Sequence, residues 1–160
     1  MKKYFLFALA ALSIIAYYGC GKDLPSSTTG CTNALPYADS STLISFAGDS
    51  IPLTMDSTGL IYHIIDSGSS TKPGPYALMN VTYVGRTMTN QVFDSATNTN
   101  LNNTPLNQLI LGWRIGLPKI GVGGRIQLFI PSAYAWGCTG YGGIGPNQPV
   151  FFDVRLIKLN

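Results

Sequence analysis

Short apolar segments alternate with stretches rich in glycine, proline and asparagine over most of the chain after residue 50. Within several of these segments the apolar residues recur at every second position, which is typical of β-strands with one buried face. The pattern predicts strands over residues 60–65, 77–84, 125–130 and 150–159, and a short extended piece that ends at Phe93-Asp94. Polar residues 95–105 and glycine-rich residues 132–149 are expected to form loops.

Two segments carry a helical pattern instead. Ser40 or Ser41 can cap a short helix that runs to Asp49 and has one apolar face. Residues 113–120 can form about two helical turns, which Pro118 should keep short or irregular. Together the elements predict an α+β fold: an antiparallel β-sheet wrapped around one short α-helix, with a short N-terminal helix before the sheet.

The N-terminus has the features of an export signal. Lys2 and Lys3 precede an uncharged, mostly apolar stretch over residues 4–18. This stretch is shorter than the roughly 20 apolar residues of a membrane-spanning helix, which favours a secretory signal over residues 1–19. Gly19-Cys20 follows directly and is similar to a bacterial lipoprotein processing site. Cys20 would then become the lipidated first residue, whereas the alternative is an ordinary cleaved signal with an incidental cysteine.

The next segment predicts a spacer and a possible cross-link. Residues 20–40 are rich in Ser, Thr, Pro and Gly, so we expect a lipidated flexible tether there, followed by a single domain over residues 41–160. Export implies an oxidising compartment in which disulfides persist. If Cys20 is acylated, Cys31 and Cys138 remain as a pair, and we expect a disulfide between them. Two free thiols are the alternative.

Composition excludes several classes of function. The net charge of +3 is small and forms no basic stripe, so we expect no nucleic-acid partner. Residues 140–145 spell G-x-G-x-x-G, but Pro146 follows where a dinucleotide site requires a helix. His63 is the only histidine and has no plausible nucleophile partner, so it is read as an ordinary strand residue. No metal-ligand cluster is apparent, and we expect no metal and no cofactor.

Six short motifs occur in a fixed order over about the last 100 residues. They are VTYVG at 81–85, VFDS at 92–95, LILGW at 109–113, GGR at 123–125 before Ile130-Pro131, YAWG at 134–137 and FDV at 152–154. Each motif alone is weak, but the ordered set resembles the FKBP family of prolyl isomerases. The resemblance implies a peptidyl-prolyl cis-trans isomerase that acts on proline-containing polypeptides. With the export signal and Gly19-Cys20, we expect it in a bacterial cell envelope, as a monomer that the lipid on Cys20 holds to a membrane.

The same resemblance implies the residues of an apolar pocket. Catalytic roles fall to Tyr83, Phe93, Asp94, Trp113 and Phe152, and substrate-binding roles to Leu109, Ile110, Tyr134 and Trp136. Trp113 would form the pocket floor, and the backbone N–H of Ile110 would hold a substrate carbonyl. Asp94 also stands out by itself, since a carboxylate among aromatic residues needs hydrogen-bond donors. The hydroxyl of Tyr83 is a candidate donor.

Two departures from the family keep a second function open. Trp136 stands where the family usually has a tyrosine whose hydroxyl bonds the ligand, and an indole N–H cannot accept a hydrogen bond. The loop over residues 99–105 lacks the aromatic residue that the family tends to place on the pocket rim. These changes favour a non-catalytic binding or chaperone lipoprotein, whereas Asp94 and Trp113 favour catalysis. A structural surface lipoprotein without a pocket is a third alternative.

Overall fold

A computed structural model describes residues 30–160 of the chain. The predicted export signal and the predicted lipidation at Cys20 lie outside the described residues. Among residues 30–160, no helix has the length and apolar character that crossing a membrane requires. The compact unit spans Cys31–Asn160.

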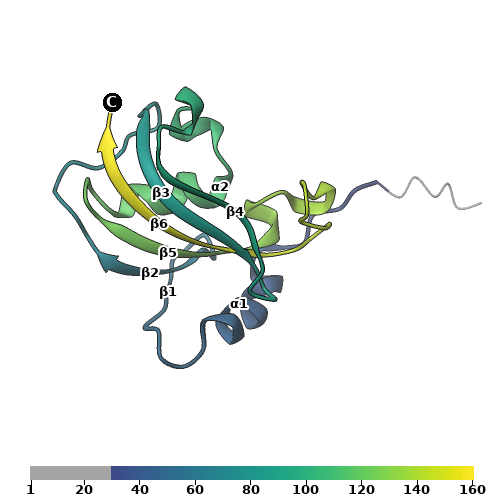
Figure 1. The fold of residues 1–160 in the computed structure, drawn as a ribbon. Helices are drawn as coiled ribbons and strands as arrows, with labels where there is room; N and C mark the ends of the chain where they lie inside the picture. Colours follow the sequence, from purple (N-terminus) through teal and green to yellow (C-terminus); the bar gives the residue numbers. More distant parts are fainter. Residues whose placement is uncertain (1–29) are drawn as a thin grey trace, which may run out of the picture. The chain divides into compact units, whose positions relative to one another are not determined.

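One antiparallel sheet of six strands forms the centre of the fold (Figure 1). Its strand order is β1-β2-β5-β6-β3-β4. The strands are β1 Thr54–Met55, β2 Ile61–Asp66, β3 Met79–Thr87, β4 Val92–Thr99, β5 Arg125–Ile130 and β6 Val150–Leu159. Two α-helices accompany them, α1 Ser40–Ala47 and α2 Leu111–Gly116. The predicted α+β architecture is thus confirmed, including the short helix before the sheet.

Successive side chains of β5 and β6 point to opposite faces of the sheet, and apolar residues on each face contribute to a separate core. Ile126, Leu128 and Ile130 belong to the main core, which also includes Trp113 of α2. Phe129, which points to the opposite face, belongs to a smaller core with Leu43 of α1. The two helices therefore cover opposite faces of the curved sheet, with α1 on the smaller core (Figure 1).

The strand β4 is longer than the sequence pattern predicts. The extended piece expected to end at Phe93-Asp94 continues to Thr99, so the prediction of a loop from residue 95 is wrong over its first part. The strand lies at the edge of the sheet and pairs only with β3. An edge strand with exposed positions tolerates Ser, Thr and Asn, and for that reason it lacks the apolar alternation that identifies a buried strand.

Both helices differ from their predicted bounds for local reasons. The helix α1 ends at Ala47, where Gly48 adopts φ +70° and donates its N–H to the carbonyl of Ile44. It begins at Ser40, and the carboxylate of the preceding Asp39 does not cap the helix but accepts two hydrogen bonds from Ser132. After α2 the chain forms a 3-10 turn at Leu117–Lys119, as Pro118 led us to expect.

Candidate active site

Five aromatic side chains from separate elements meet on the side of the sheet that faces α2. We call them the aromatic cluster: Tyr83 of β3, Phe93 of β4, Trp113 of α2, Phe152 of β6, and Trp136 in the loop after β5. Each is among the site residues predicted from the sequence. The antiparallel pairing of β3 with both β4 and β6 brings three of them onto neighbouring strands.

Phe152 lies at the centre of the cluster. Its ring centroid is 5.3 Å from that of Trp113 and 5.4 Å from that of Phe93, with interplanar angles of 88° in both pairs. Tyr83 also packs edge-on against Trp113, at 5.2 Å. Such edge-to-face pairs are favoured by the ring quadrupoles and hold each ring in one orientation. Phe152 and Trp113 are only 3% and 5% exposed, so Phe93, Tyr83 and Trp136 form the accessible part.

Gly85 makes this arrangement possible, although no site role was predicted for it. In the sheet register Gly85 lies between Asp94 on β4 and Phe152 on β6. A Cβ atom at this position would be 2.8 Å from ring carbons of both Phe152 and Phe93. The absence of a side chain therefore lets the two rings close over β3. The sequence signal was available, because Gly85 ends the first of the six motifs.

Tyr83 and Asp94 form the polar part of the site. The hydroxyl of Tyr83 donates a hydrogen bond of 2.8 Å to Oδ2 of Asp94, which is the donor that the sequence suggested. Burial of the phenol, and then the hydrogen bond to the Asp94 carboxylate, raise the pKa of Tyr83 to about 12. Tyr83 therefore stays protonated, and remains a donor, throughout the physiological pH range. Asp94 itself is exposed and can contact a bound chain.

The indole N–H of Trp113 is buried without a hydrogen-bond partner among the described residues. Leu109 and Ile110, which lead into α2, are half-buried and pack against the same core. The carbonyl of Ile110 accepts hydrogen bonds from the N–H groups of Trp113 and Arg114, which fixes the start of the helix. The two predicted substrate-binding residues thus lie directly beside the cluster.

Two further predicted residues come from the segment after β5. The hydroxyl of Tyr134 donates a hydrogen bond of 2.6 Å to the carbonyl of Thr58, so it is engaged with the turn before β2. Trp136 packs edge-on against Phe93, with ring centroids 5.7 Å apart. Its other neighbour is Tyr141, whose ring stacks on the indole at 5.6 Å and an angle of 14°. Tyr141 is 68% exposed and was not predicted as a site residue.

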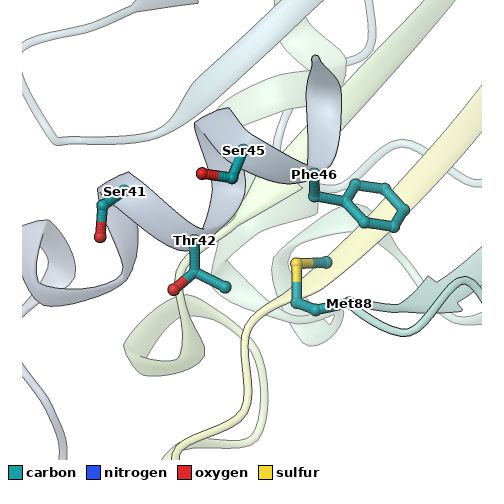
Figure 2. Close-up of a pocket in the computed structure, with 5 residues that line it drawn as sticks. All are labelled: Ser41, Thr42, Ser45, Phe46 and Met88. Atoms are coloured by element: carbon teal, nitrogen blue, oxygen red, sulfur yellow. The ribbon is translucent and has the colours of Figure 1, made fainter.

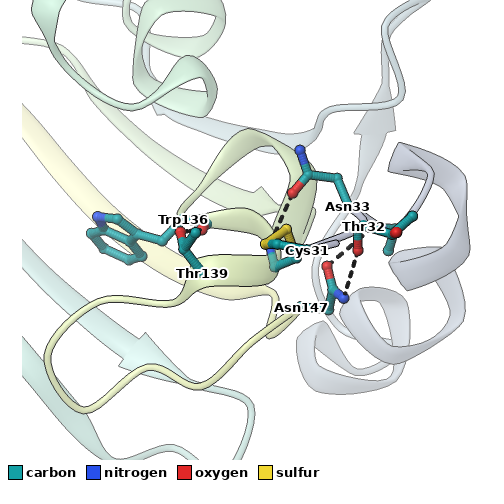
Figure 3. The surroundings of a disulfide bond; sticks show 8 residues. Cys31, Thr32, Asn33, Trp136, Thr139 and Asn147 are labelled. Atoms are coloured by element: carbon teal, nitrogen blue, oxygen red, sulfur yellow. Dashed lines mark hydrogen bonds between the residues drawn. A yellow bond between two sulfur atoms is a disulfide. The ribbon is translucent and has the colours of Figure 1, made fainter. Parts of the chain in front are cut away.

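Residues 136–149, which we call the rim loop, carry Trp136 and Tyr141 and have little regular structure. They contain a 3-10 turn at Gly137–Thr139 and one isolated bridge between Tyr141 and Ile144. A disulfide joins Cys138 of the rim loop to Cys31, the pair expected from the sequence (Figure 3). Residues near the start of the compact unit are thereby attached to the edge of the aromatic cluster.

Two open hollows lie elsewhere among the described residues, and Tyr83 is the one member of the aromatic cluster that lines either of them. One, of about 430 Å³, is lined by Phe46, Met88 and three hydroxyl side chains of α1, namely Ser41, Thr42 and Ser45 (Figure 2). The other, of about 490 Å³, lies over the opposite face of the sheet and is lined by residues of β3, β5 and β6, four of which are charged. There Arg125 and Asp153 bind each other through two hydrogen bonds, of 2.8 and 2.9 Å.

Neither hollow offers groups suited to chemistry. The hydroxyls of the first have no base beside them among its lining residues, and the one carboxylate of the second, Asp153, is paired with Arg125. Within residues 30–160, no three His, Cys, Asp or Glu side chains are grouped as a metal ion would require. The aromatic cluster with the Tyr83–Asp94 pair is therefore the candidate active site.

Comparison with known proteins gives a consistent assignment. Residues 69–157 match the family described as FKBP-type peptidyl-prolyl cis-trans isomerase. FK506-binding protein 1 of Saccharomyces cerevisiae is 36% identical over 104 residues, which cover 62% of this chain and 91% of the yeast protein. Outer membrane protein MIP of Legionella longbeachae is also 36% identical over 104 residues, 64% of this chain but 45% of that protein.

A solved structure shows the same fold. The crystal structure of FkpA from Escherichia coli superposes with a TM-score of 0.66 and 31% sequence identity. The match covers 77% of this chain and 58% of the FkpA chain. The chain thus spans about half the length of these two bacterial relatives, and nearly the whole of the yeast protein.

Proposed function

The chain belongs to the family of FKBP-type peptidyl-prolyl cis-trans isomerases, and on this premise we propose that the aromatic cluster is its catalytic site for X–Pro bonds. One observation carries this assignment. Phe152 packs edge-on against Trp113 and Phe93, directly beside the hydrogen-bonded Tyr83–Asp94 pair. The site thus combines a rigid apolar surface with one oriented carboxylate, and both features suit a proline residue within a peptide chain.

Catalysis of this reaction requires neither a nucleophile nor a proton transfer. An X–Pro amide is planar because of resonance, and rotation takes tens to hundreds of seconds without a catalyst. The planar amide is more charge-separated than the twisted transition state, so an apolar surface that excludes water favours the twisted form. Trp113, Phe93 and Phe152 would supply this surface, while Tyr83 and Asp94 orient the chain.

The residues around the cluster would hold the rest of the substrate. Leu109 and Ile110 lie beside Trp113, and the N–H of Ile110 would donate to a substrate carbonyl. Trp136 would cover the proline from the rim loop, next to Phe93. Tyr134 would contribute its ring, since its hydroxyl already binds the carbonyl of Thr58. We propose that this site functions in a monomer.

A protease-coupled isomerisation assay on the full chain in detergent tests this function. The substrate is a peptide with an apolar residue before proline. We expect a rate above background in the parent and a much lower rate in Trp113→Leu, which keeps an apolar floor but removes the ring. Phe129→Leu is the matched control, because it makes a similar change in the smaller core beside α1. A folded parent without any rate above background refutes the catalytic function.

A non-catalytic binding or chaperone function is the second candidate, and the rim loop is what favours it. Trp136 lacks the acceptor oxygen of a tyrosine, and it stacks with the exposed ring of Tyr141. Together they form an aromatic surface suited to gripping proline-rich or apolar segments. Binding of a proline peptide by a parent that shows no isomerisation selects this candidate over the first.

The proposed cellular place is the bacterial envelope, with a lipid on Cys20 as the anchor. The disulfide between Cys31 and Cys138 supports export, because such bonds persist in oxidising compartments. The relative from Legionella longbeachae is named an outer membrane protein. Metabolic labelling with a fatty acid tests the anchor: label should appear in the parent and be lost in Cys20→Ser. Equal labelling of the two proteins refutes it.

A further inference from the structure

The first described residues lie against the rim loop. We call residues 31–34 the N-terminal strap. Its disulfide from Cys31 reaches Cys138, two positions after Trp136 (Figure 3). Oδ1 of Asn33 accepts a hydrogen bond of 2.9 Å from the backbone N–H of the same Cys138. One covalent bond and one hydrogen bond therefore fix the same position of the rim loop.

Asn147, near the other end of the rim loop, is bound to the strap as well. Its Oδ1 accepts a hydrogen bond of 3.1 Å from the N–H of Ala34, and its Nδ2 donates one of 3.1 Å to the carbonyl of Thr32. The backbone N–H of Asn147 donates to the carbonyl of Gly137 at 2.8 Å. The strap thus holds both ends of the rim loop together, as Figure 3 shows around the disulfide.

The packing between strap and loop leaves no room for a side chain at Gly137. This glycine directly follows Trp136 and has φ +55°, a conformation that other residues rarely adopt. A Cβ atom there would collide with Oδ1 of Asn33. The Asn33 side chain thus occupies the space beside the peptide unit that carries the Trp136 ring.

The strap thus contacts the chain directly after Trp136, at Gly137 and Cys138. Within the rim loop, Thr139 and Gly140 donate hydrogen bonds to the carbonyl of Trp136, and the ring of Tyr141 stacks on its indole. Several glycines in the loop add conformational freedom. The indole is nevertheless set edge-on against Phe93.

We propose that the N-terminal strap positions Trp136 for the substrate, with Cys31, Asn33 and Asn147 as positioning residues. The substrate part of this inference rests on the proposed function. Without the strap, the Trp136 ring would become ordered only when the peptide binds, and the entropy lost in that ordering would weaken peptide affinity. The apolar surface that favours the twisted amide, formed by Trp113, Phe93 and Phe152, lies outside the rim loop, so kcat should not change.

Fluorine NMR and kinetics together test the positioning. The sequence contains two tryptophans, so the full chain labelled with fluorotryptophan gives two resonances, which Trp136→Phe assigns. In the double variant Cys31→Ser/Cys138→Ser, and in Asn33→Ala, we expect the Trp136 resonance to shift or broaden while that of Trp113 stays in place. KM should rise about two- to tenfold, the factor for ordering one side chain on binding, with kcat unchanged.

Two control variants separate positioning from stability. Asn33→Asp keeps an acceptor oxygen for the N–H of Cys138, so it should show the spectrum and the KM of the parent, unlike Asn33→Ala. Leu43→Ala removes packing in the smaller core, so it should lower thermal stability without moving the Trp136 resonance. The proposal is overturned if the strap variants leave both the Trp136 resonance and KM unchanged. It is also overturned if they and Leu43→Ala move both resonances alike.

Failure of the proposed function has a different signature. The parent protein could lack isomerase activity while the strap variants still shift the Trp136 resonance. That result would refute the catalytic function but leave the positioning of Trp136 by the strap intact. In that case a parent-like Trp136 resonance in Asn33→Asp, with a shifted one in Asn33→Ala, supports the strap as the element that orients the ring.

Discussion

The hydroxyl of Tyr83 donates a hydrogen bond of 2.8 Å to Oδ2 of Asp94 across the β3–β4 pair. This hydrogen bond holds the Asp94 carboxylate in one orientation beside the aromatic cluster. The phenol is partly buried against Trp113 and Phe152, whereas the carboxylate is exposed. The pair can therefore act on a bound peptide through the free oxygen of Asp94 while Tyr83 holds the carboxylate in place.

Substitution of Asp94 should impair catalysis without unfolding the protein. In Asp94→Ala we expect kcat/KM to fall by about ten- to a hundredfold, which corresponds to a lost hydrogen bond to a charged group, about 1.5–3 kcal/mol. Because Asp94 is exposed, the thermal midpoint should change little. Asp49→Ala, which removes the same charge from an exposed position after α1, is the control and should retain the parent rate. An unchanged kcat/KM in Asp94→Ala would contradict the orienting role.

Tyr83 should make stability depend on pH at the alkaline end. Its pKa is raised to about 12 in the folded protein, from an ordinary value of 10.0. Between these values the unfolded chain has lost the Tyr83 proton and the folded protein has kept it, so folding binds a proton there. The contribution of Tyr83 to stability is therefore complete below pH 10 and is lost as the pH rises toward 12.

Urea unfolding of the parent and of Tyr83→Phe checks this dependence. The free energy of unfolding should fall more steeply in the parent than in the variant between pH 10 and 12. The difference between the two proteins isolates Tyr83 from the other tyrosines, which titrate in both. Parallel curves over this range would show that the phenol is not perturbed.

Gly85 should be intolerant of even a methyl group. In Gly85→Ala the new Cβ would lie 2.8 Å from ring carbons of Phe93 and Phe152, and both rings would have to shift. We expect a loss of about 1–3 kcal/mol in stability, typical of overpacking, together with a lower kcat/KM. Gly74→Ala is the matched control, since a Cβ at Gly74 meets nothing within 4 Å. Equal stability and activity in the two variants would refute the close approach.

The sequence predicts the buried strands better than the edge of the sheet. The bounds of β5 and β6 agree with the apolar alternation, because residues such as Leu128 and Phe152 face a closed core. The alternation fails in β4, where Ser95 and Asn98 lie on an edge strand and need no apolar partner. A pattern of burial can identify a strand only where the fold buries it.

The order of motifs in the sequence predicts the candidate site residues, but not the residues that hold them in place. The ordered motifs named the five rings of the aromatic cluster, and the need of a carboxylate for hydrogen-bond donors suggested Tyr83 as the partner of Asp94. Gly85 and Asn33 escaped because their roles depend on atoms of residues far away in the sequence, such as Phe152 and Cys138. No local pattern records such a contact, which arises only when the chain has folded.

The ion pair between Asp56 and Lys119 stabilises the turn that accepts a hydrogen bond from Tyr134. Nζ of Lys119 lies 2.8 Å from Oδ2 of Asp56, and the two side chains are 23% and 17% exposed. Asp56 also accepts a hydrogen bond of 2.9 Å from the N–H of Thr58, whose carbonyl binds the hydroxyl of Tyr134. Burial alone would raise the pKa of Asp56, but the hydrogen bonds from Lys119 and Thr58 outweigh it and lower the pKa below its usual value.

This lowered pKa predicts a loss of stability in acid. Above its unfolded pKa of 3.8, Asp56 is ionised in both states and the ion pair stabilises the fold; as the pH falls through the lower folded pKa, that contribution is lost. Asp56→Asn should cost about 1–2 kcal/mol at pH 7, because the amide still accepts from Thr58. Its unfolding free energy should then converge with that of the parent in acid, as measured by urea unfolding from pH 7 to 2. Asp49→Asn is the control at an exposed position, and a constant gap between parent and Asp56→Asn would show that the carboxylate is not paired in solution.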